Sequence, residues 1–314
     1  MSPSVVPIGV TGATGQLGGR VARRLAAAGV AQRLVVRDPG RAPQLPGADV
    51  VRAAFGDGDS VRKALAGLDT VLMVSASETV DRVVQHRTFV DAAAAAGVGH
   101  LVYISFSGAA PDATFTLARD HWATEQHIRA SGVPFTFLRD NLYADFLPQM
   151  VGADGVIRGP AGGSPAGGSP ADPGTAGSAH EDGAPADRAP AGAGRAAVVA
   201  QDDIADAVVA VLRDPGAHAG RAYELTGPEA LTLAEVAAVI TTVTGRPVSY
   251  VQETIEEAYA SRATYGAPGW QVDAWVSTYT AIADGSLATV TTAISELTGH
   301  PATPLEQVLR TRGD

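Results

Sequence analysis

The sequence has 314 residues, of which 46% are hydrophobic, enough for one α/β core and a smaller lobe. It contains no cysteine, which excludes disulfides, cysteine-ligated metal centres and thiolate catalysis, and its net charge of -10 argues against nucleic-acid binding. No apolar segment approaches the roughly 18–20 residues that span a bilayer, and the amino terminus lacks the basic stretch of a signal peptide, so we expect a cytoplasmic protein without membrane contact.

Short apolar runs alternate with amphipathic helical patterns through the first half of the chain. Strands are expected at 5–10, 34–36, 50–52, 70–73, 101–104 and 135–138, and helices at 17–28, 60–65, 80–96 and 118–130. Four glycines follow these helices, at positions where a left-handed C-cap is expected: Gly29, Gly67, Gly97 and Gly132. The alternation predicts an α/β fold, a doubly wound parallel sheet of the Rossmann type with a smaller C-terminal substrate-binding lobe.

The second half divides into an insertion and a further ordered part. Residues 159–195 are rich in Gly, Ala and Pro, and we expect a disordered insertion there because this composition buries too little apolar surface. Residues 202–212 are typical of an N-capped amphipathic helix, 223–225 of a short strand, and 232–235 of a capping box. The predicted division is thus a core domain at 1–158, the insertion at 159–195, and the rest of the core with the lobe at 196–314.

A glycine-rich turn follows the first predicted strand and opens the first helix. Gly12, Gly15 and Gly18 have the spacing Gly-x-x-Gly-x-x-Gly, which differs from the usual Gly-x-Gly-x-x-Gly because residue 10 is Val10. Backbone N–H groups and the helix N-terminus converge at such a turn, where a pyrophosphate binds. We therefore expect residues 1–158 to bind NAD(P), with contacts from these glycines and from Thr14, Gln16 and Leu17.

Two further residues bear on the choice of dinucleotide. Arg37 ends the second strand, where an arginine accommodates the 2′-phosphate of NADPH, so NADPH is favoured. Asp38 follows it and would instead favour NADH, and Arg37 has the alternative role of a solvated loop residue. Asp57 follows the third strand, where it would either meet the adenine or serve as a turn or N-cap residue.

With these residues in place, the chain resembles the NmrA-like group of atypical short-chain dehydrogenase/reductases, and within it the bacterial NAD(P)H:quinone oxidoreductases. The resemblance covers nearly everything except the insertion. It rests on runs at 11–18, 35–39, 72–78, 85–87, 92–105, 121–125 and 131–141. It implies a quinone-like small-molecule acceptor, and that Asn141, Tyr143 and Phe146 face the nicotinamide and the acceptor, with Phe106 as the opposite wall. Core packing is the alternative role of Phe146.

The Tyr-x-x-x-Lys pair of typical short-chain dehydrogenases is absent. The chain has one lysine, Lys63, and Asp59 stands four residues before it; Leu117 and His121 stand where the pair would fall. His121 is our candidate to supply a proton to the acceptor, with Glu125 orienting it, and a packing role is the alternative. The catalytic candidates are thus His121, Asn141 and Tyr143, and no metal is implied.

Serines follow the fourth and fifth predicted strands, at the carboxyl edge of the sheet. Ser75, Ala76, Ser77 and Ser105 are expected to contact the cofactor there, and an ordinary polar turn is the alternative for each serine.

We therefore interpret the chain as an NADPH-dependent reductase of quinones or similar electrophilic carbonyls. One alternative is a redox sensor of the NmrA type, which binds NADP without turnover and regulates a protein partner; an isomerase or tailoring enzyme is a third. A homodimer is left open.

Overall fold

The structure is a computed structural model that describes residues 6–162 and 193–312. In this part of the chain, seven parallel strands form one sheet with the order β3-β2-β1-β4-β5-β6-β8. They are β1 (Ile8–Thr11), β2 (Gln32–Val36), β3 (Ala48–Arg52), β4 (Thr70–Met73), β5 (His100–Phe106), β6 (Phe135–Asp140) and β8 (Ala222–Leu225). The order reverses between β1 and β4, the switch point at which Rossmann folds bind their ligands.

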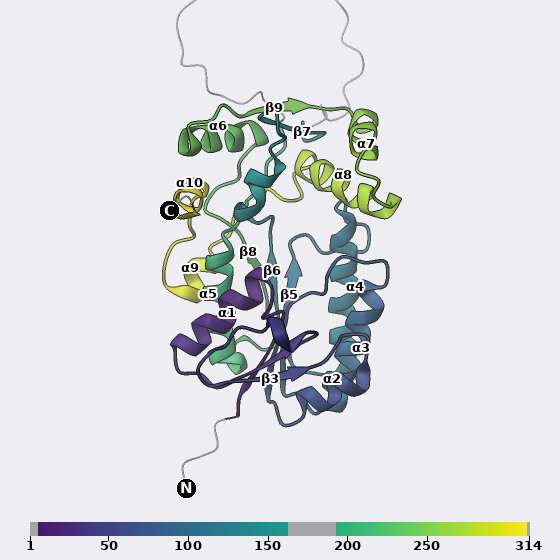
Figure 1. Cartoon of the computed structure of the whole chain (residues 1–314), viewed down its shortest axis with the longest axis vertical. Coiled ribbons are helices and arrows are strands. Elements are labelled where there is room, and N and C mark those ends of the chain that lie inside the picture. Colours follow the sequence, from purple (N-terminus) through teal and green to yellow (C-terminus); the bar gives the residue numbers. More distant parts are fainter. Residues whose placement is uncertain (1–5, 163–192, 313–314) are drawn as a thin grey trace, which may run out of the picture.

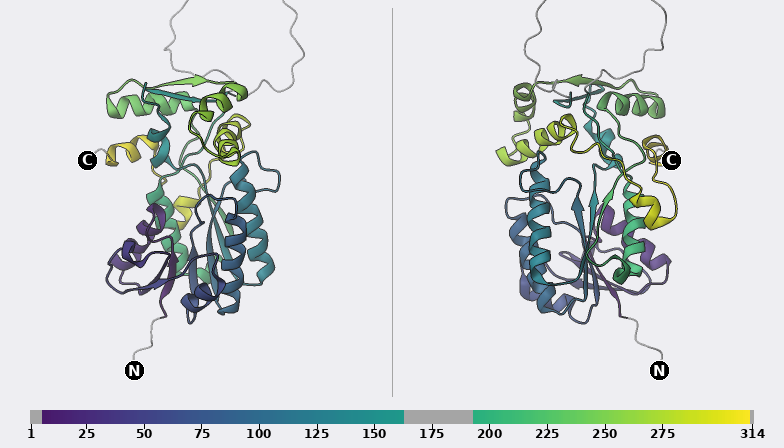
Figure 2. Two further views of the ribbon diagram at one scale, coloured as in Figure 1. Left: turned by 45° about the vertical axis from the view of Figure 1, so that its right-hand side comes forward. Right: turned by 180° about the vertical axis from the view of Figure 1, so that it is seen from behind.

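Helices cover both faces of the sheet (Figure 1). One face carries α1 (Gln16–Ala27), α5 (Gln201–Arg213) and α9 (Ala293–Thr298), and the other carries α2 (Gly58–Leu65), α3 (Arg82–Ala95) and α4 (Thr116–Ser131). Figure 2 shows the same two layers after a turn of 45° and from behind. Short 3₁₀ turns at η1 (Pro39–Arg41) and η3 (Pro215–His218) complete the connections.

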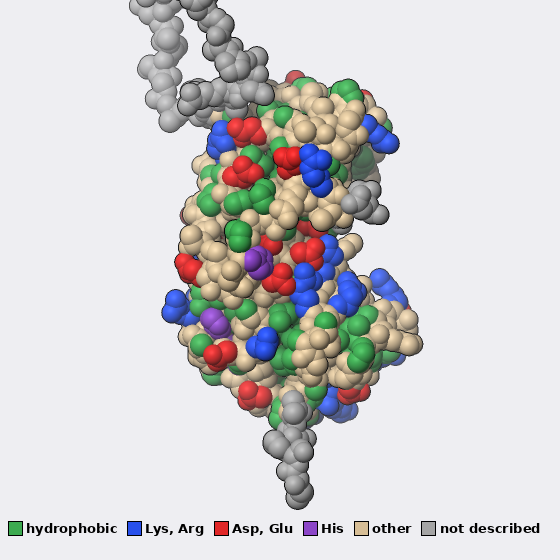
Figure 3. All heavy atoms as spheres, turned by 90° about the vertical axis from the view of Figure 1, so that its left-hand side faces the viewer, with side chains coloured by type: hydrophobic (Ala, Val, Ile, Leu, Met, Phe, Trp, Pro, Cys, Tyr) green, Lys and Arg blue, Asp and Glu red, His purple; other side chains and the backbone are tan. Residues whose placement is uncertain are grey.

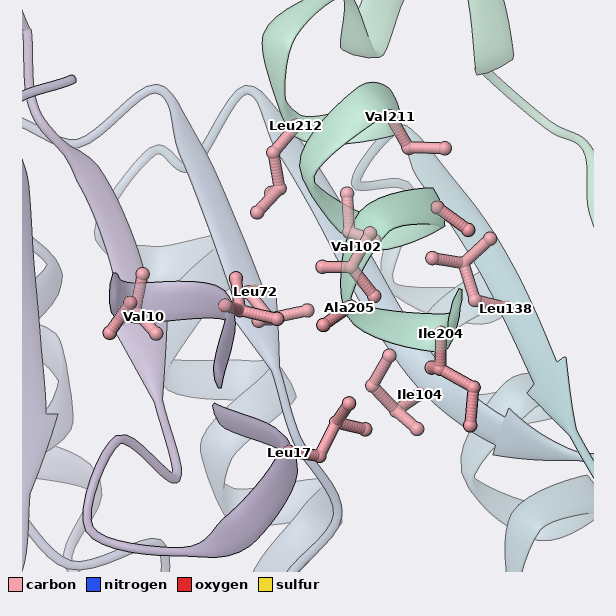
Figure 4. Close-up of a cluster of buried hydrophobic side chains, with 14 of the residues drawn as sticks. Val10, Leu17, Leu72, Val102, Ile104, Leu138, Ile204, Ala205, Val211 and Leu212 are labelled. Atoms are coloured by element: carbon pink, nitrogen blue, oxygen red, sulfur yellow. The ribbon is translucent and has the colours of Figure 1, made fainter. Parts of the chain in front are cut away.

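The core on the α1 and α5 side depends on apolar contacts between strands and helices (Figure 4). Leu72 and Leu138 are fully buried in β4 and β6, and Ile204 and Val208 are fully buried in α5. The burial follows from the sequence, because strands covered on both faces are apolar at successive positions, whereas α5 is apolar along one side only.

A smaller lobe lies over the carboxyl ends of the strands (Figure 1). It contains η2 (Ala144–Met150), α6 (Leu233–Thr244), α7 (Ile255–Ala263), α8 (Gly269–Ala283), α10 (Leu305–Arg312) and a parallel pair of strands, β7 (Val156–Gly159) and β9 (Ser249–Gln252). Thr232 and Glu235 form the expected capping box at α6. The lobe has its own apolar core, which includes Ile157, Leu233 and Tyr279.

The structure confirms the predicted strands and helices of the first half within a few residues, corrects two expectations and adds two short strands. β1 begins at Ile8 and not at residue 5. Helix α5 begins at Gln201, with Ala200 at the N-cap and no side-chain cap, so Asp202 lies in the first turn. The short strands β7 and β9 were not predicted, because four residues are too few to establish a period of two.

The expected insertion at 159–195 falls mostly outside the described residues, which omit 163–192. Its two ends, residues 159–162 and 193–195, are described. Gly194 N–H donates to the Ala161 carbonyl, Gly162 pairs with Ala193, and Arg195 forms an ion pair with Glu235. These described residues of the predicted insertion are therefore tied to each other and to the lobe.

No helix within residues 6–162 and 193–312 is both long and apolar enough to cross a membrane. On the face drawn in Figure 3, basic and acidic side chains alternate over the surface without a continuous basic band.

Truncation of Leu72 is expected to destabilise the fold. Leu72→Ala removes a fully buried side chain from the central strand β4, and such changes cost about 2–5 kcal/mol. The control Val80→Ala changes a side chain that is 83% exposed, and should stay within about 0.5 kcal/mol of the original protein. Equal denaturation midpoints for the two variants in guanidinium chloride would contradict the assignment of Leu72 to the core.

Candidate active site

The glycine-rich turn joins β1 to α1 at the switch point. Gly12 has a φ of 67°, and a Cβ on it would lie 2.9 Å from the Cβ of Val74. A Cβ on Gly18 would overlap the carbonyl oxygen of Gly12, so the helix packs against the turn only with glycine there. Gly15 is the N-cap of α1 and offers no side-chain cap, and the first turn has no acidic residue. The helix N-terminus therefore has backbone N–H groups to offer an anion.

A cavity of about 260 Å³ opens over this turn. It brings together ten of the predicted cofactor residues: Gly12, Thr14, Gly15, Gln16, Leu17, Gly18, Arg37, Ser75, Ala76 and Ser77. Phe55 and Gln85 complete the lining on the α3 side. A glycine cradle, a helix N-terminus and a basic side chain are the donors that a dinucleotide phosphate requires, so the residues present fit this cofactor.

Arg37 lies at the edge of this cavity, directly after β2. Its side chain is exposed and forms no ion pair with any residue in the described ranges. Asp38 instead caps η1 by accepting a hydrogen bond from the Gly40 N–H. Arg37 is therefore available to an anionic ligand, whereas the Asp38 carboxylate is occupied by its own turn.

Two predicted cofactor residues are not brought to this cavity. Asp57 is exposed and accepts a hydrogen bond from Ser60 N–H, so it is the N-cap of α2, the alternative considered for it. Ser105 is fully buried and donates to Glu125 at 2.6 Å. Glu125 is itself held by Arg139. Ser105 therefore belongs to a buried polar network between β5, α4 and β6.

A second cavity, of about 540 Å³, meets the first at the loop after β4. Both cavities are lined by the residues of that loop, Val74, Ser75, Ala76 and Ser77. The walls of the second cavity are largely aromatic or aliphatic: Phe106, Phe115, Leu117, Tyr143, Phe146, Leu147 and Met150. The rings of Phe106 and Phe115 lie 4.8 Å apart, and those of Tyr143 and Phe146 lie 5.7 Å apart. Such walls suit a flat, apolar molecule.

His121 lines the second cavity but is held from two sides. Its Nε2 lies 3.2 Å from Arg82 Nη2, and its Nδ1 lies 3.0 Å from the Tyr103 hydroxyl. An arginine only donates, so Nε2 accepts and the proton resides on Nδ1. Burial and then Arg82 hold the pKa of His121 well below its ordinary value. The expected partner Glu125 forms its hydrogen bonds with Ser105 and Arg139 instead.

Two residues that were not singled out as site residues fix the loop between the cavities. Ala76 N–H donates to Nε2 of His86 at 2.9 Å, and Arg82 Nε donates to the Ala76 carbonyl at 3.1 Å. His86 Nδ1 lies 2.9 Å from the Thr124 hydroxyl. His86 lies in the run 85–87, which entered the sequence analysis only as part of the family resemblance. The signal available in the sequence was their spacing, since Arg82 and His86 are four residues apart and therefore lie on the same side of α3.

Asn141, Asp140 and Tyr143 follow one another at the carboxyl end of β6, and all three line the second cavity. Asn141 donates to the Leu287 carbonyl and accepts from Leu142 N–H, so its amide ties backbone segments together. Tyr143 donates to Asp140 at 2.5 Å, and burial raises the pKa of Asp140 to about 8.

In the part of the chain that the structure describes, no group of three or more potential ligands is placed to hold a metal ion.

The loop anchor should make stability depend on pH. Burial and then Arg82 lower the pKa of His86 to about 3, against an ordinary value of about 6.5 in the unfolded chain. The unfolded state then binds more protons, so the free energy of unfolding falls as the pH drops from about 6.5 towards 3, by up to about 1.4 kcal/mol per pH unit for this histidine.

His86→Gln keeps an acceptor for Ala76 N–H but does not titrate, so this variant should show a shallower acid-side slope than the original protein. Denaturant titrations between about pH 4.5 and 6.5 measure the difference, which cancels the contributions of all other groups. Parallel curves would contradict a buried neutral His86.

Comparisons with known proteins show the family of the chain. The family model described as the NmrA-like family matches residues 6–268. Quinone oxidoreductase 2 of Escherichia coli is 32% identical over 307 residues, 96% of each chain. The (4-alkanoyl-5-oxo-2,5-dihydrofuran-3-yl)methyl phosphate reductase of Streptomyces griseus is 34% identical over 301 residues, 94% of each chain. The crystal structure of an NADPH-dependent quinone oxidoreductase, QOR2 of Escherichia coli, in complex with NADPH superimposes with a TM-score of 0.81 at 29% identity, covering 98% of this chain and 100% of that one. The chain belongs to the NmrA-like family.

Proposed function

We propose that this chain is a cytoplasmic NADPH-dependent reductase that transfers hydride to a quinone or a similar flat electrophile. The observation that carries the proposal is the meeting of the two cavities at Val74–Ser77. A polar cavity with a glycine cradle lies on one side of that loop, and a cavity with aromatic walls lies on the other. A reduced nicotinamide and an acceptor would thus lie next to each other, which is what direct hydride transfer requires.

The cofactor would be held by the turn at Gly12–Gly18, by the N-terminus of α1 and by Arg37. When bound, it supplies the hydride. Two similar proteins support this assignment, since one is quinone oxidoreductase 2 of Escherichia coli and the other is the crystal structure of QOR2 from that organism in complex with NADPH.

Positioning accounts for most of the expected catalysis. Lys63 is exposed on α2 and lines neither cavity, so it cannot replace the lysine of a Tyr-x-x-x-Lys pair. A quinone accepts hydride readily because its reduced form is aromatic, so a fixed geometry between two bound rings is the main requirement. The Phe106–Phe115 wall and the Tyr143–Phe146 wall would hold the acceptor ring between them.

The size and the apolar walls of the second cavity favour a reductase over a regulator. A sensor that binds NADP without turnover needs no acceptor pocket, so an occluded or polar space would be expected beside its nicotinamide. The cavity here has about 540 Å³ and a largely apolar wall. It is large enough for one or two fused rings.

Removal of Arg37 should separate the two dinucleotides. Arg37→Ala deletes the cation beside the proposed 2′-phosphate, so the Kd for NADPH should rise about 10- to 100-fold, and the Kd for NADH should change little, because a charged hydrogen bond contributes about 1.5–3 kcal/mol. Arg41→Ala, which removes an exposed arginine of η1 that lines neither of the two cavities, is the matched control. Fluorescence titration measures both constants; an equal loss for NADPH and NADH would place the 2′-phosphate elsewhere.

Phe146 tests the acceptor wall. NADPH oxidation, followed by absorbance with benzoquinones and naphthoquinones, should be saturable, and Phe146→Ala should raise the KM for naphthoquinones about 2- to 10-fold, from about 0.5–1.5 kcal/mol of ring contact. The Kd for NADPH serves as the internal control and should not change, because Phe146 lines the second cavity and not the first. Cofactor binding without turnover on any acceptor would contradict the reductase.

A further inference from the structure

The end of β6 places an acid and a phenol together on the wall of the second cavity. Asp140 is the last residue of β6, and Tyr143 lies three residues later, before η2. The Tyr143 hydroxyl lies 2.5 Å from Oδ2 of Asp140, at the short end of the range of an O–H···O hydrogen bond. Asp140 is 3% exposed, whereas Tyr143 is half-buried and therefore nearer to any ligand.

The charges around this pair determine its protonation. Arg82 approaches from α3 and favours the ionised carboxylate, and Glu224 on β8 opposes it. Burial outweighs both the hydrogen bond from Tyr143 and the charge of Arg82 and raises the pKa of Asp140 to about 8, so this carboxyl group carries a proton at neutral pH. Burial and the neighbouring Asp140 carboxyl hold the pKa of Tyr143 well above 10, and Asp145 acts in the same direction. The phenol alone therefore cannot release a proton at neutral pH.

The other groups that face the cavity offer no proton of suitable acidity. His121 has its only N–H directed to Tyr103, and its Nε2 accepts from Arg82. The hydroxyl of Ser75 donates to the Ile104 carbonyl at 2.8 Å. The amide of Asn141 is bonded to backbone on both sides. Arg82 also lines the cavity, but a guanidinium group does not lose its proton in proteins. When Asp140 is protonated, its O–H donates to the Tyr143 oxygen, and the Tyr143 O–H is then able to turn toward the cavity. This leaves the pair of Asp140 and Tyr143.

We propose that Asp140 and Tyr143 form the proton relay that neutralises the oxyanion produced when the acceptor is reduced, an inference that rests on the proposed reductase function. Hydride transfer adds two electrons and one hydrogen to the quinone and leaves a hydroquinone monoanion. The oxyanion takes the proton of the Tyr143 hydroxyl as a new O–H bond forms, and Tyr143 takes the proton of Asp140. Asp140 becomes a carboxylate and regains a proton from water, so one quinone, one NADPH and one proton give one hydroquinone and one NADP⁺.

The first test examines the protein alone. The infrared difference spectrum between the original protein and Asp140→Asn should contain the carbonyl band of a protonated carboxylic acid at pH 6–7, and this band should disappear as the pH rises through about 8. Glu229→Gln, which removes the charge of an exposed carboxylate, is the control and should leave the band in place. If the difference spectrum shows only an ionised carboxylate at pH 6, the relay is excluded, whatever the protein's activity.

The second test measures turnover. In the original protein kcat for a naphthoquinone should fall as the pH rises above about 8, and Asp140→Asn should lower kcat about 10²-fold at neutral pH and remove this fall. Tyr143→Phe should lower kcat while keeping the infrared band, since the Asp140 carboxyl group remains. The Kd for NADPH should be unchanged in both variants, because neither residue lines the first cavity.

The outcomes distinguish the relay from the reductase. Unchanged kcat and an unchanged alkaline limb in Asp140→Asn would overturn the relay and leave the reductase in place. No turnover in the original protein with any quinone would overturn the reductase itself.

Discussion

The position of the loop after β4 controls both cavities, and three hydrogen bonds fix that position. Val74 N–H donates to the Thr11 hydroxyl at the end of β1, at 2.8 Å. Ala76 donates to His86 and accepts from Arg82. The loop therefore has partners from the sheet and from α3, and each polar group of Ala76 is satisfied by a buried side chain. Buried backbone groups without partners cost free energy, so this arrangement is strongly preferred over any shifted loop.

Arg82 links this anchor to the chemistry of the second cavity. Its guanidinium group contacts Ala76 and His121 and is 5% exposed, so its charge acts through little water. It helps to keep His86 and His121 neutral and able to accept hydrogen bonds, and it partly offsets the burial of Asp140. The buried positive charge of Arg82 thus acts on neighbouring groups that are themselves neutral. The nearest carboxylate in the described residues, Asp120, lies 3.9 Å away, which leaves the charge of Arg82 only partly neutralised.

The sequence predicted the parts of the fold that depend on local patterns. The β1 turn, the alternation of strands and helices, the glycine C-caps and the capping box at Thr232 all follow from residues close together in the chain. Ten of the expected cofactor residues line one cavity for the same reason, since one turn and the ends of neighbouring strands supply them. Asp57 was ambiguous, because an aspartate before a helix has the same sequence signature whether it caps the helix or meets a ligand.

The acceptor side could be predicted less well, because its chemistry depends on contacts between distant residues. His121 lines the cavity. Only the structure shows that its Nε2 accepts a hydrogen bond from Arg82, which lies 39 positions away in the sequence. Ser105 was expected at the cofactor and instead forms a buried network with Glu125, a partner 20 positions away. Asp140 was passed over, since a carboxylate at the end of a strand gains its significance only when burial and Tyr143 are known.

The most direct test of this arrangement is a crystal structure of the protein with NADP⁺ and a naphthoquinone. We expect the nicotinamide beside Ala76 and the quinone ring between the Phe106 and Tyr143 walls, with nicotinamide C4 about 3–3.5 Å from the acceptor ring, the separation required for direct transfer. A dinucleotide bound at the glycine turn with the quinone bound outside the second cavity would contradict the meeting of cofactor and acceptor at this loop.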